Sequence, residues 1–140
     1  MNKINDFSRE SPGRLYIVGT PIGNLEDVSF RTIHILKKVG LIAAEDTRHT
    51  RKLLSHYDIH TPLTSFFEHN EEKKTPYLID KIKKGNDVAL VSKAGMPCIS
   101  DPGYYLVKKA VENNIEVVPI PGPCALILSL IHIWRCRRIR

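Results

Sequence analysis

Two carboxylates and a guanidinium stand directly after a short apolar run in the first third of the chain. Glu45, Asp46 and Arg48 follow the run Leu41–Ala44. In nucleotide-binding α/β domains, an acid at such a place binds ribose hydroxyls. A structural alternative exists, because Asp46 or Thr47 could cap the next helix while Arg48 pairs locally. We favour function for Glu45, whereas for Asp46 the residues alone favour the cap.

Glycine and proline gather in other short segments that also follow apolar runs. These segments are Thr20–Asn24, Ala94–Gly103 and Pro121–Ala125. Glycine lets a backbone approach a ligand closely, and proline fixes the path of the chain. Thr20–Asn24 could equally be an ordinary turn, and it lacks the G-x-G-x-x-G pattern of dinucleotide sites. The paired Gly and Pro clusters of Ala94–Gly103 favour a site for a flat ligand beside free helix amides.

The histidines and cysteines do not indicate metal or thiol chemistry. The six histidines show no ligand spacing, and the three cysteines form neither a disulfide framework nor a zinc pattern. Cys124 follows a turn and has no base beside it in the sequence, which argues against a nucleophilic role. We therefore predict no metal site and a reduced, cytoplasmic protein.

Length and composition indicate one globular domain. The chain has 140 residues, of which 42% are hydrophobic and 26% are charged. It contains no apolar run of about 18 residues, so we expect no membrane partner. The net charge of +6 includes four arginines in the last six residues. Basicity alone is therefore weak evidence for nucleic-acid binding.

Apolar runs alternate with helical patterns along the chain. Strands are predicted at residues 14–20, 41–44, 62–67, 87–92 and 115–120, each bounded by turn residues. The first predicted helix runs from Asp27, as cap, to Val39, with Val28, Ile35, Leu36 and Val39 facing inward. The second covers residues 47–57, and the third runs from Asn70 to Lys84. The fourth follows Asp101-Pro102, with Tyr104, Val107 and Val111 facing inward. Pro76 either kinks the third helix or opens a shorter one that Thr75 caps.

Alternation of this kind predicts an α/β fold with a doubly wound, mostly parallel sheet. Ligands of such sheets bind outside the carboxyl ends of the strands. All four segments described above follow predicted strands, so we expect them at one edge of the sheet.

Five stretches at these loops resemble the tetrapyrrole methylase-like family. They are LYIVGTPIGNLED (15–27), LIAAEDTRHT (41–50), FFEHNE (66–71), VALVSKAGMPCISDPGY (88–104) and VVPIPGPCA (117–125), in the family's order and spacing. The resemblance implies the N-terminal domain of a two-domain methylase fold. It divides the chain into a flexible leader (1–13), an α/β methylase domain (14–125), and the start of an inter-domain helix with a non-native tail (126–140).

The resemblance also implies a function. Family members bind S-adenosylmethionine (SAM) between two α/β domains, and the branch most like this chain methylates the ribose 2′-oxygen of a cytidine in 16S rRNA of the small ribosomal subunit. The implied cofactor contacts are Pro21, Ala94, Gly95, Met96, Cys124 and Ala125. Glu45, Asp46 and Arg48 match a motif at the cleft edge, with Glu45 the candidate to accept the proton of the hydroxyl. For the intact member a homodimer is implied.

Two departures from the family pattern stand out. The family loop reads Ser-Asp-Ala-Gly-Thr-Pro, whereas this chain has Lys93 and Met96 in place of the Asp and the Thr. The match also stops after Ala125, so we expect a truncated chain that is inactive alone. Two alternatives remain: a folded, non-catalytic fragment, or another α/β methyltransferase or nucleotide-binding domain with Glu45 as ribose ligand.

Overall fold

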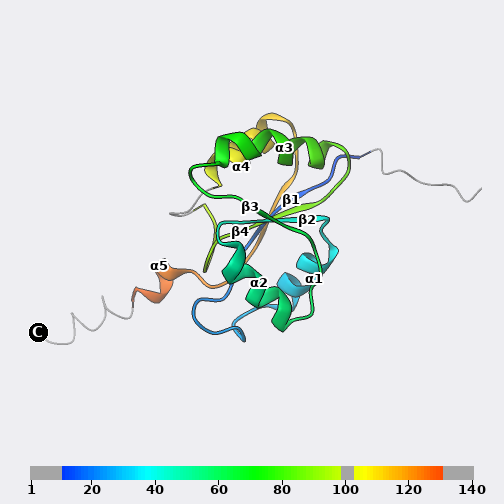
Figure 1. The fold of residues 1–140 in the computed structure, drawn as a ribbon. Helices are drawn as coiled ribbons and strands as arrows, with labels where there is room; N and C mark the ends of the chain where they lie inside the picture. Colours follow the sequence, from blue (N-terminus) through cyan, green and yellow to red (C-terminus); the bar gives the residue numbers. More distant parts are fainter. Residues whose placement is uncertain (1–10, 99–102, 131–140) are drawn as a thin grey trace, which may run out of the picture.

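A computed structural model describes residues 11–98 and 103–130 of the chain. The elements in this part are β1 (Leu15–Val18), α1 (Phe30–Lys38), β2 (Leu41–Ala44), α2 (Thr47–His56), β3 (Leu63–Ser65), α3 (Glu71–Lys83), β4 (Val88–Val91), α4 (Tyr104–Glu112), β5 (Val117–Ile120) and α5 (Ala125–Leu128). The five strands form one sheet in the order β3-β2-β4-β1-β5, and every pairing is parallel. Helices α1 and α2 cover one face, and α3 and α4 cover the other (Figure 1). The predicted doubly wound α/β fold is confirmed.

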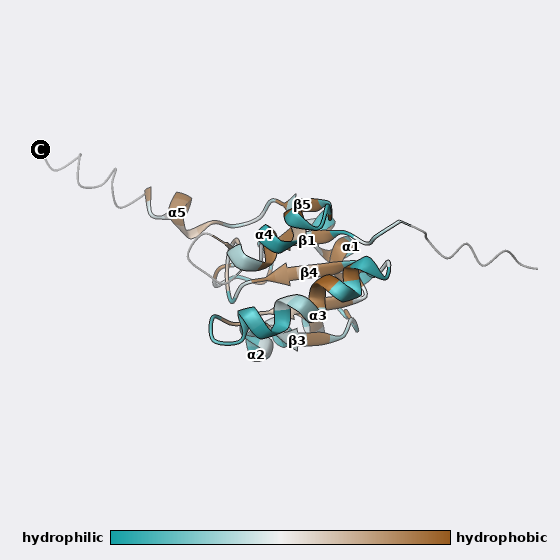
Figure 2. Ribbon diagram, turned by 90° about the horizontal axis from the view of Figure 1, so that it is seen from above, coloured by the Kyte–Doolittle hydropathy of each residue, from teal (hydrophilic) through white to brown (hydrophobic). Residues whose placement is uncertain are grey.

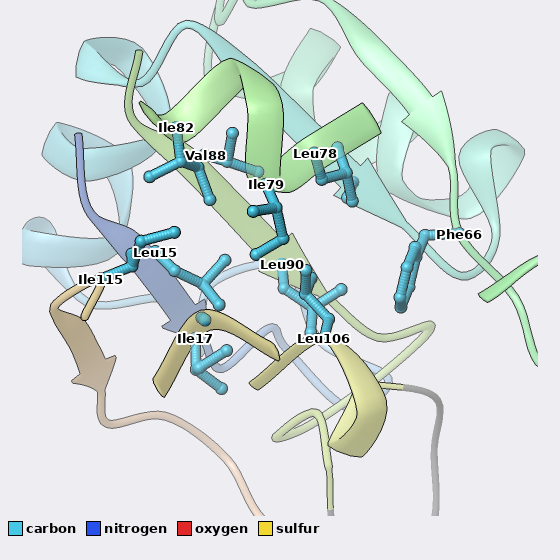
Figure 3. Packing of buried hydrophobic residues seen from close by; sticks show 12 residues of the cluster. Leu15, Ile17, Phe66, Leu78, Ile79, Ile82, Val88, Leu90, Leu106 and Ile115 are labelled. Carbon is cyan, nitrogen blue, oxygen red and sulfur yellow. The ribbon is translucent and has the colours of Figure 1, made fainter. Parts of the chain in front are cut away.

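The strands are buried on both faces, as a parallel sheet between two helical layers requires. Successive side chains of β1 alternate between the layers: Leu15 and Ile17 join the cluster under α3 and α4, whereas Tyr16 and Val18 join the one under α1 and α2. Figure 3 shows the first cluster, to which Leu90 of β4 and Leu106 of α4 both belong. None of the helices in the described residues is long and apolar enough to cross a membrane.

Helix α1 begins later than predicted. Asp27 is not its cap, because the Asp27 amide donates to the Asn24 carbonyl in a turn (3.1 Å). The cap is Ser29, whose hydroxyl accepts from the Thr32 amide at 3.1 Å. Val28 therefore lies outside the helix and is only half-buried. The predicted burial of Ile35, Leu36 and Val39 is confirmed.

Helix α3 runs through Pro76. It begins after Asn70, so the shorter helix capped by Thr75 is wrong. Proline lacks the amide that would donate to the carbonyl of Glu72. The Thr75 hydroxyl donates to the neighbouring Glu71 carbonyl at 2.7 Å.

Helix α4 presents a different face from the one predicted. Tyr104 and Val111 are 74% and 63% exposed, while Leu106 and Ala110 are fully buried. The prediction spaced its inward positions from Tyr104, but this residue is the first of the helix. The one correct position, Val107, packs against the core beside the buried pair. The predicted cap Asp101-Pro102 lies outside the described residues.

Adjacent phenylalanines allow a matched test of the core. Phe66 is fully buried, whereas Phe67 is 39% exposed. We expect Phe66→Ala to lower the free energy of unfolding by about 3–5 kcal/mol, because it removes a ring from the core. Phe67→Ala is expected to cost less than about 1 kcal/mol. Urea unfolding measures both, and equal losses would contradict the burial described here.

The cap of α2 predicts a pH-dependent stability. Asp46 Oδ1 accepts from the amides of His49 (3.1 Å) and Arg48 (3.0 Å). The His49 amide chiefly lowers the pKa of this carboxyl, helped by the Arg48 amide and the Lys93 charge. Since the folded-state pKa is the lower one, the stabilisation is complete well above the unfolded value of about 3.9 and is lost as pH falls through the folded-state value.

We expect Asp46→Ala to lower the free energy of unfolding by about 1 kcal/mol at pH 7. Asp46→Asn keeps an acceptor oxygen and should cost less. The difference between the wild type and Asp46→Asn should shrink as the pH is lowered from 7 to 3 in urea titrations. A difference that stays constant with pH would show that the carboxylate charge plays no part.

Candidate functional site

The loops that the sequence singled out share one edge of the sheet. They follow β1, β2, β4 and β5, and parallel strands place their carboxyl ends together. Figure 2 shows the arrowhead of β4 pointing toward the end of the molecule at which α5 lies. The expected gathering of turns at one edge is therefore present, and the contacts between the loops define how they fit together.

A backbone bridge joins the loop after β1 to the loop after β4. The Thr20 amide donates to the Gly95 carbonyl and the Gly95 amide donates to the Thr20 carbonyl, both at 3.0 Å. The Ser92 hydroxyl lies 3.1 Å from both the Ala94 and Gly95 carbonyl oxygens, which share its single proton. Thr20, Ser92 and Gly95 are buried, so these bonds are shielded from water.

The loop after β5 packs against the same two loops. A Cβ placed on Gly19 would lie 2.6 Å from Met96 Sδ and 2.7 Å from Gly122 Cα. Gly95 has φ +80°, and a Cβ there would lie 3.2 Å from both an Ile22 side-chain carbon and the Pro123 carbonyl oxygen. Glycine is thus required at Gly19 for close approach and at Gly95 for its backbone conformation.

The loop after β2 joins this group through a carboxylate. Glu45 Oε2 accepts from the Lys93 backbone amide at 3.0 Å, across 48 residues of sequence. Asp46 caps α2, so the capping alternative for this residue is confirmed. Lys93 is exposed and interacts electrostatically with Asp46. Arg48 is also exposed, and it lines a groove along α2.

The residues predicted to contact a cofactor lie in the three packed loops but differ in burial. Pro21 and Gly95 are buried, and Ala94, Met96 and Cys124 are half-buried. Ala125 is exposed and begins α5, where Leu126 and Ile127 are 64% and 61% exposed. The bridge and the glycine contacts bring Pro21, Gly95 and Met96 into one packed unit. Cys124 and Ala125 follow directly on Pro123, which touches that unit.

A small hollow lies between the first loop and α2. Its volume is about 10 Å³, and Pro21, His49 and Lys93 are among the residues that line it. This is about the smallest volume that can hold a single water molecule. The hollow therefore results from close packing of the loop after β1 on α2. A ligand would have to bind on the open side of the loops.

Sequence reasoning missed one residue that holds this edge. Glu71, in the first turn of α3, accepts through Oε1 from the amides of Gly103 and Tyr105, both at 3.0 Å. It thereby supplies the acceptor that the first turn of α4 needs, since Gly103 has no side chain to cap it. Glu71 ends the motif FFEHNE, which was the one available signal. Nothing local in the sequence connects it to a helix that begins about 30 residues later.

Together, Glu45 and Glu71 hold the segment after β4 from both sides. Glu45 binds the amide of Lys93 at its start, and Glu71 binds the amides of Gly103 and Tyr105 beyond its end. A hydrogen bond from an amide to a carboxylate is stronger than one to a neutral acceptor. Glu45 therefore helps to fix the backbone that leads into Ala94–Met96, and Glu71 fixes the start of α4.

Comparison with known proteins shows what this chain is similar to. The chain is 57% identical over 123 residues to ribosomal RNA small subunit methyltransferase I of Halalkalibacterium halodurans, which covers 88% of the chain and 43% of that protein. It is 53% identical over 128 residues to the protein of the same name in Escherichia coli O157:H7, covering 91% of the chain and 45% of the relative. The chain thus spans less than half the length of these curated relatives.

A solved structure supports the fold independently. Uroporphyrin-III-C-methyltransferase from Thermus thermophilus superposes with a TM-score of 0.64 over 79% of this chain and 46% of its own, at 21% identity. The family model described as tetrapyrrole (corrin/porphyrin) methylases matches residues 14–130, which include all of the loops described above. The chain therefore belongs to the tetrapyrrole methylase family.

Proposed function

We propose that this chain forms the N-terminal part of an enzyme that transfers a methyl group from SAM to the ribose 2′-oxygen of a cytidine in 16S rRNA. The identity of 57% to a ribosomal RNA small subunit methyltransferase carries this proposal. Packing of the motif-bearing loops into one unit at the sheet edge supports it, because ligands of such sheets bind there.

In this proposal the three packed loops form one wall of the SAM site. The wall consists of Pro21, Ala94, Gly95, Met96, Cys124 and Ala125. These side chains are small or apolar, which suits the flat and apolar parts of SAM. The sulfonium is a cation, and Lys93 brings a like charge to the edge. The Asp46 carboxylate interacts electrostatically with Lys93 and partly offsets that charge, so the residues present fit the group.

Bound SAM supplies an electrophilic methyl group on its sulfonium sulfur. The protein has to place the ribose hydroxyl in line with that methyl and to accept the hydroxyl proton. We assign the proton to the carboxylate of Glu45, whose Oε2 is held by the Lys93 amide. Asp46 acts as a positioning residue through α2, and Arg48 binds the rRNA near the reacting ribose.

The same proposal sets the context of the intact enzyme. The intact enzyme acts on the small ribosomal subunit in the cytoplasm, and its oligomeric state is a homodimer. The exposed Leu126 and Ile127 on α5 support burial against further protein, since neighbouring apolar side chains rarely remain uncovered.

A chimaera tests the proposed activity. Residues 14–130 of this chain would replace the matching part of the Halalkalibacterium halodurans relative. We expect the chimaera to transfer the labelled methyl group of SAM to small ribosomal subunits that lack this modification. Mass spectrometry of nucleosides from the product should find the label on a cytidine ribose. The chain alone serves as a control and should transfer no label.

Two outcomes would contradict the proposal. One is a chimaera that binds SAM and folds but leaves the subunits unlabelled. The other is a chimaera that methylates a tetrapyrrole and not rRNA. Tetrapyrroles are the substrates after which the family is named.

Two substitutions at Glu45 separate proton acceptance from positioning. Glu45→Gln keeps an oxygen that can accept from the Lys93 amide but no longer takes up a proton. In the chimaera we expect it to lower kcat by about 100-fold or more, with the KM for SAM little changed. Glu45→Ala should lower kcat and also raise the KM, because the loop loses its anchor. A Glu45→Gln chimaera with normal kcat would show that Glu45 only positions the loop.

A further inference from the structure

The outer surface of α2 carries an open groove lined by basic side chains. Its volume is about 620 Å³, and the lining residues are Leu25, Arg48, Arg51, Lys52, Ser55 and His56. The Tyr57 hydroxyl donates to the Leu25 carbonyl, which holds the loop after β1 against α2. The groove is thus a feature built by two segments of the chain, with no acidic residue in its lining.

Charge is distributed unequally between the two faces of the sheet. Helices α1 and α2 contain Arg31, Lys37, Lys38, Arg48, Arg51 and Lys52, and neither helix contains an acid. Helices α3 and α4 also contain lysines, but Glu71, Glu72, Asp80 and Glu112 accompany them. The larger excess of positive charge in the helical layers therefore lies on the α1/α2 face.

The basic side chains of the groove repel one another. Arg48 lies three residues before Arg51 and four before Lys52, so the three share one face of α2. Arg48 is also near the positive end of the helix dipole, where a cation is unfavourable. Among the residues that the structure describes, no ion pair involves any of the three. On α3, by contrast, Lys84 pairs with Asp80 at 2.9 Å.

The groove is continuous with the edge that carries the proposed SAM wall. Leu25 lines both the groove and the small hollow, where it meets Pro21 and Lys93. Arg48 is the second residue of α2 and lies three residues after Glu45. A chain of phosphates lying along α2 would therefore reach the loops at the carboxyl ends of β1, β2 and β4.

We propose that the α2 groove binds the phosphate backbone of single-stranded RNA and guides the target nucleotide to the sheet edge. This inference rests on the proposed function, in which rRNA is the substrate. The groove has the charge that a polyanion requires, and neutralising it relieves the repulsion along α2. Phosphate contacts of this kind set register and affinity without reading the sequence.

Charge reversal on opposite faces tests the proposal with net charge held equal. Arg51→Glu/Lys52→Glu changes the groove, and Lys83→Glu/Lys108→Glu changes exposed lysines of α3 and α4 that make no ion pair among the described residues. Both variants keep the arginines near the end of the chain. The probe is a fluorescein-labelled RNA of about 12 nucleotides and mixed sequence, followed by fluorescence anisotropy without SAM.

We expect the groove variant to bind this RNA at least about tenfold more weakly at 0.1 M salt, and its salt dependence to fall by about 1.4 or more in log–log slope. The control should lose less than about threefold. Circular dichroism should show both variants folded. Equal losses in the two variants, or no loss in the groove variant, would overturn the proposal. Because SAM is absent, neither result bears on the methyl-transfer experiment with the chimaera.

Discussion

Two hydrogen bonds between the backbones of Thr20 and Gly95 hold together loops that are 75 residues apart in sequence. They are buried, and the glycines at Gly19 and Gly95 let the chain come close enough to make them. The loop after β5 then packs onto this bridge through Gly122 and Pro123. The wall proposed for SAM exists only because these backbones are fixed relative to one another, and no side chain of that wall has to supply the rigidity.

Carboxylates also fix the backbone at the start of the loop after β4 and beyond its end. Glu45 anchors the Lys93 amide, and Glu71 anchors the start of α4. Neither acid acts alone, since Asp46 fixes α2 next to Glu45 and the core residue Phe66 lies shortly before Glu71. Residues proposed to do chemistry and residues that hold the fold are therefore neighbours in sequence. This explains why short motifs such as LIAAEDTRHT and FFEHNE combine buried apolar positions with acids.

Much of this architecture follows from the sequence because local patterns determine it. Apolar runs ended by Gly and Pro predicted the strands, and a parallel sheet necessarily brings their carboxyl ends together. The start of α1 was misplaced because Asp27 is used in a turn, and the inward face of α4 was misjudged from Tyr104. The role of Glu71 depends on a contact between distant segments. The outward basic residues of α2 follow from its helical pattern, but the groove also needs Leu25 from the loop after β1. The net charge of the chain did not predict the groove, because it does not show on which face the cations lie.

The most direct test of the proposed site is a crystal structure of the chimaera with S-adenosylhomocysteine, the demethylated product of SAM. The account predicts that its sulfur lies in van der Waals contact with Ala94–Met96 and that its adenosine packs beside Cys124 and Ala125. It also predicts that the Thr20–Gly95 bridge is retained in the complex. A ligand bound on the α3/α4 face, or one that displaces the bridge, would contradict the central claim.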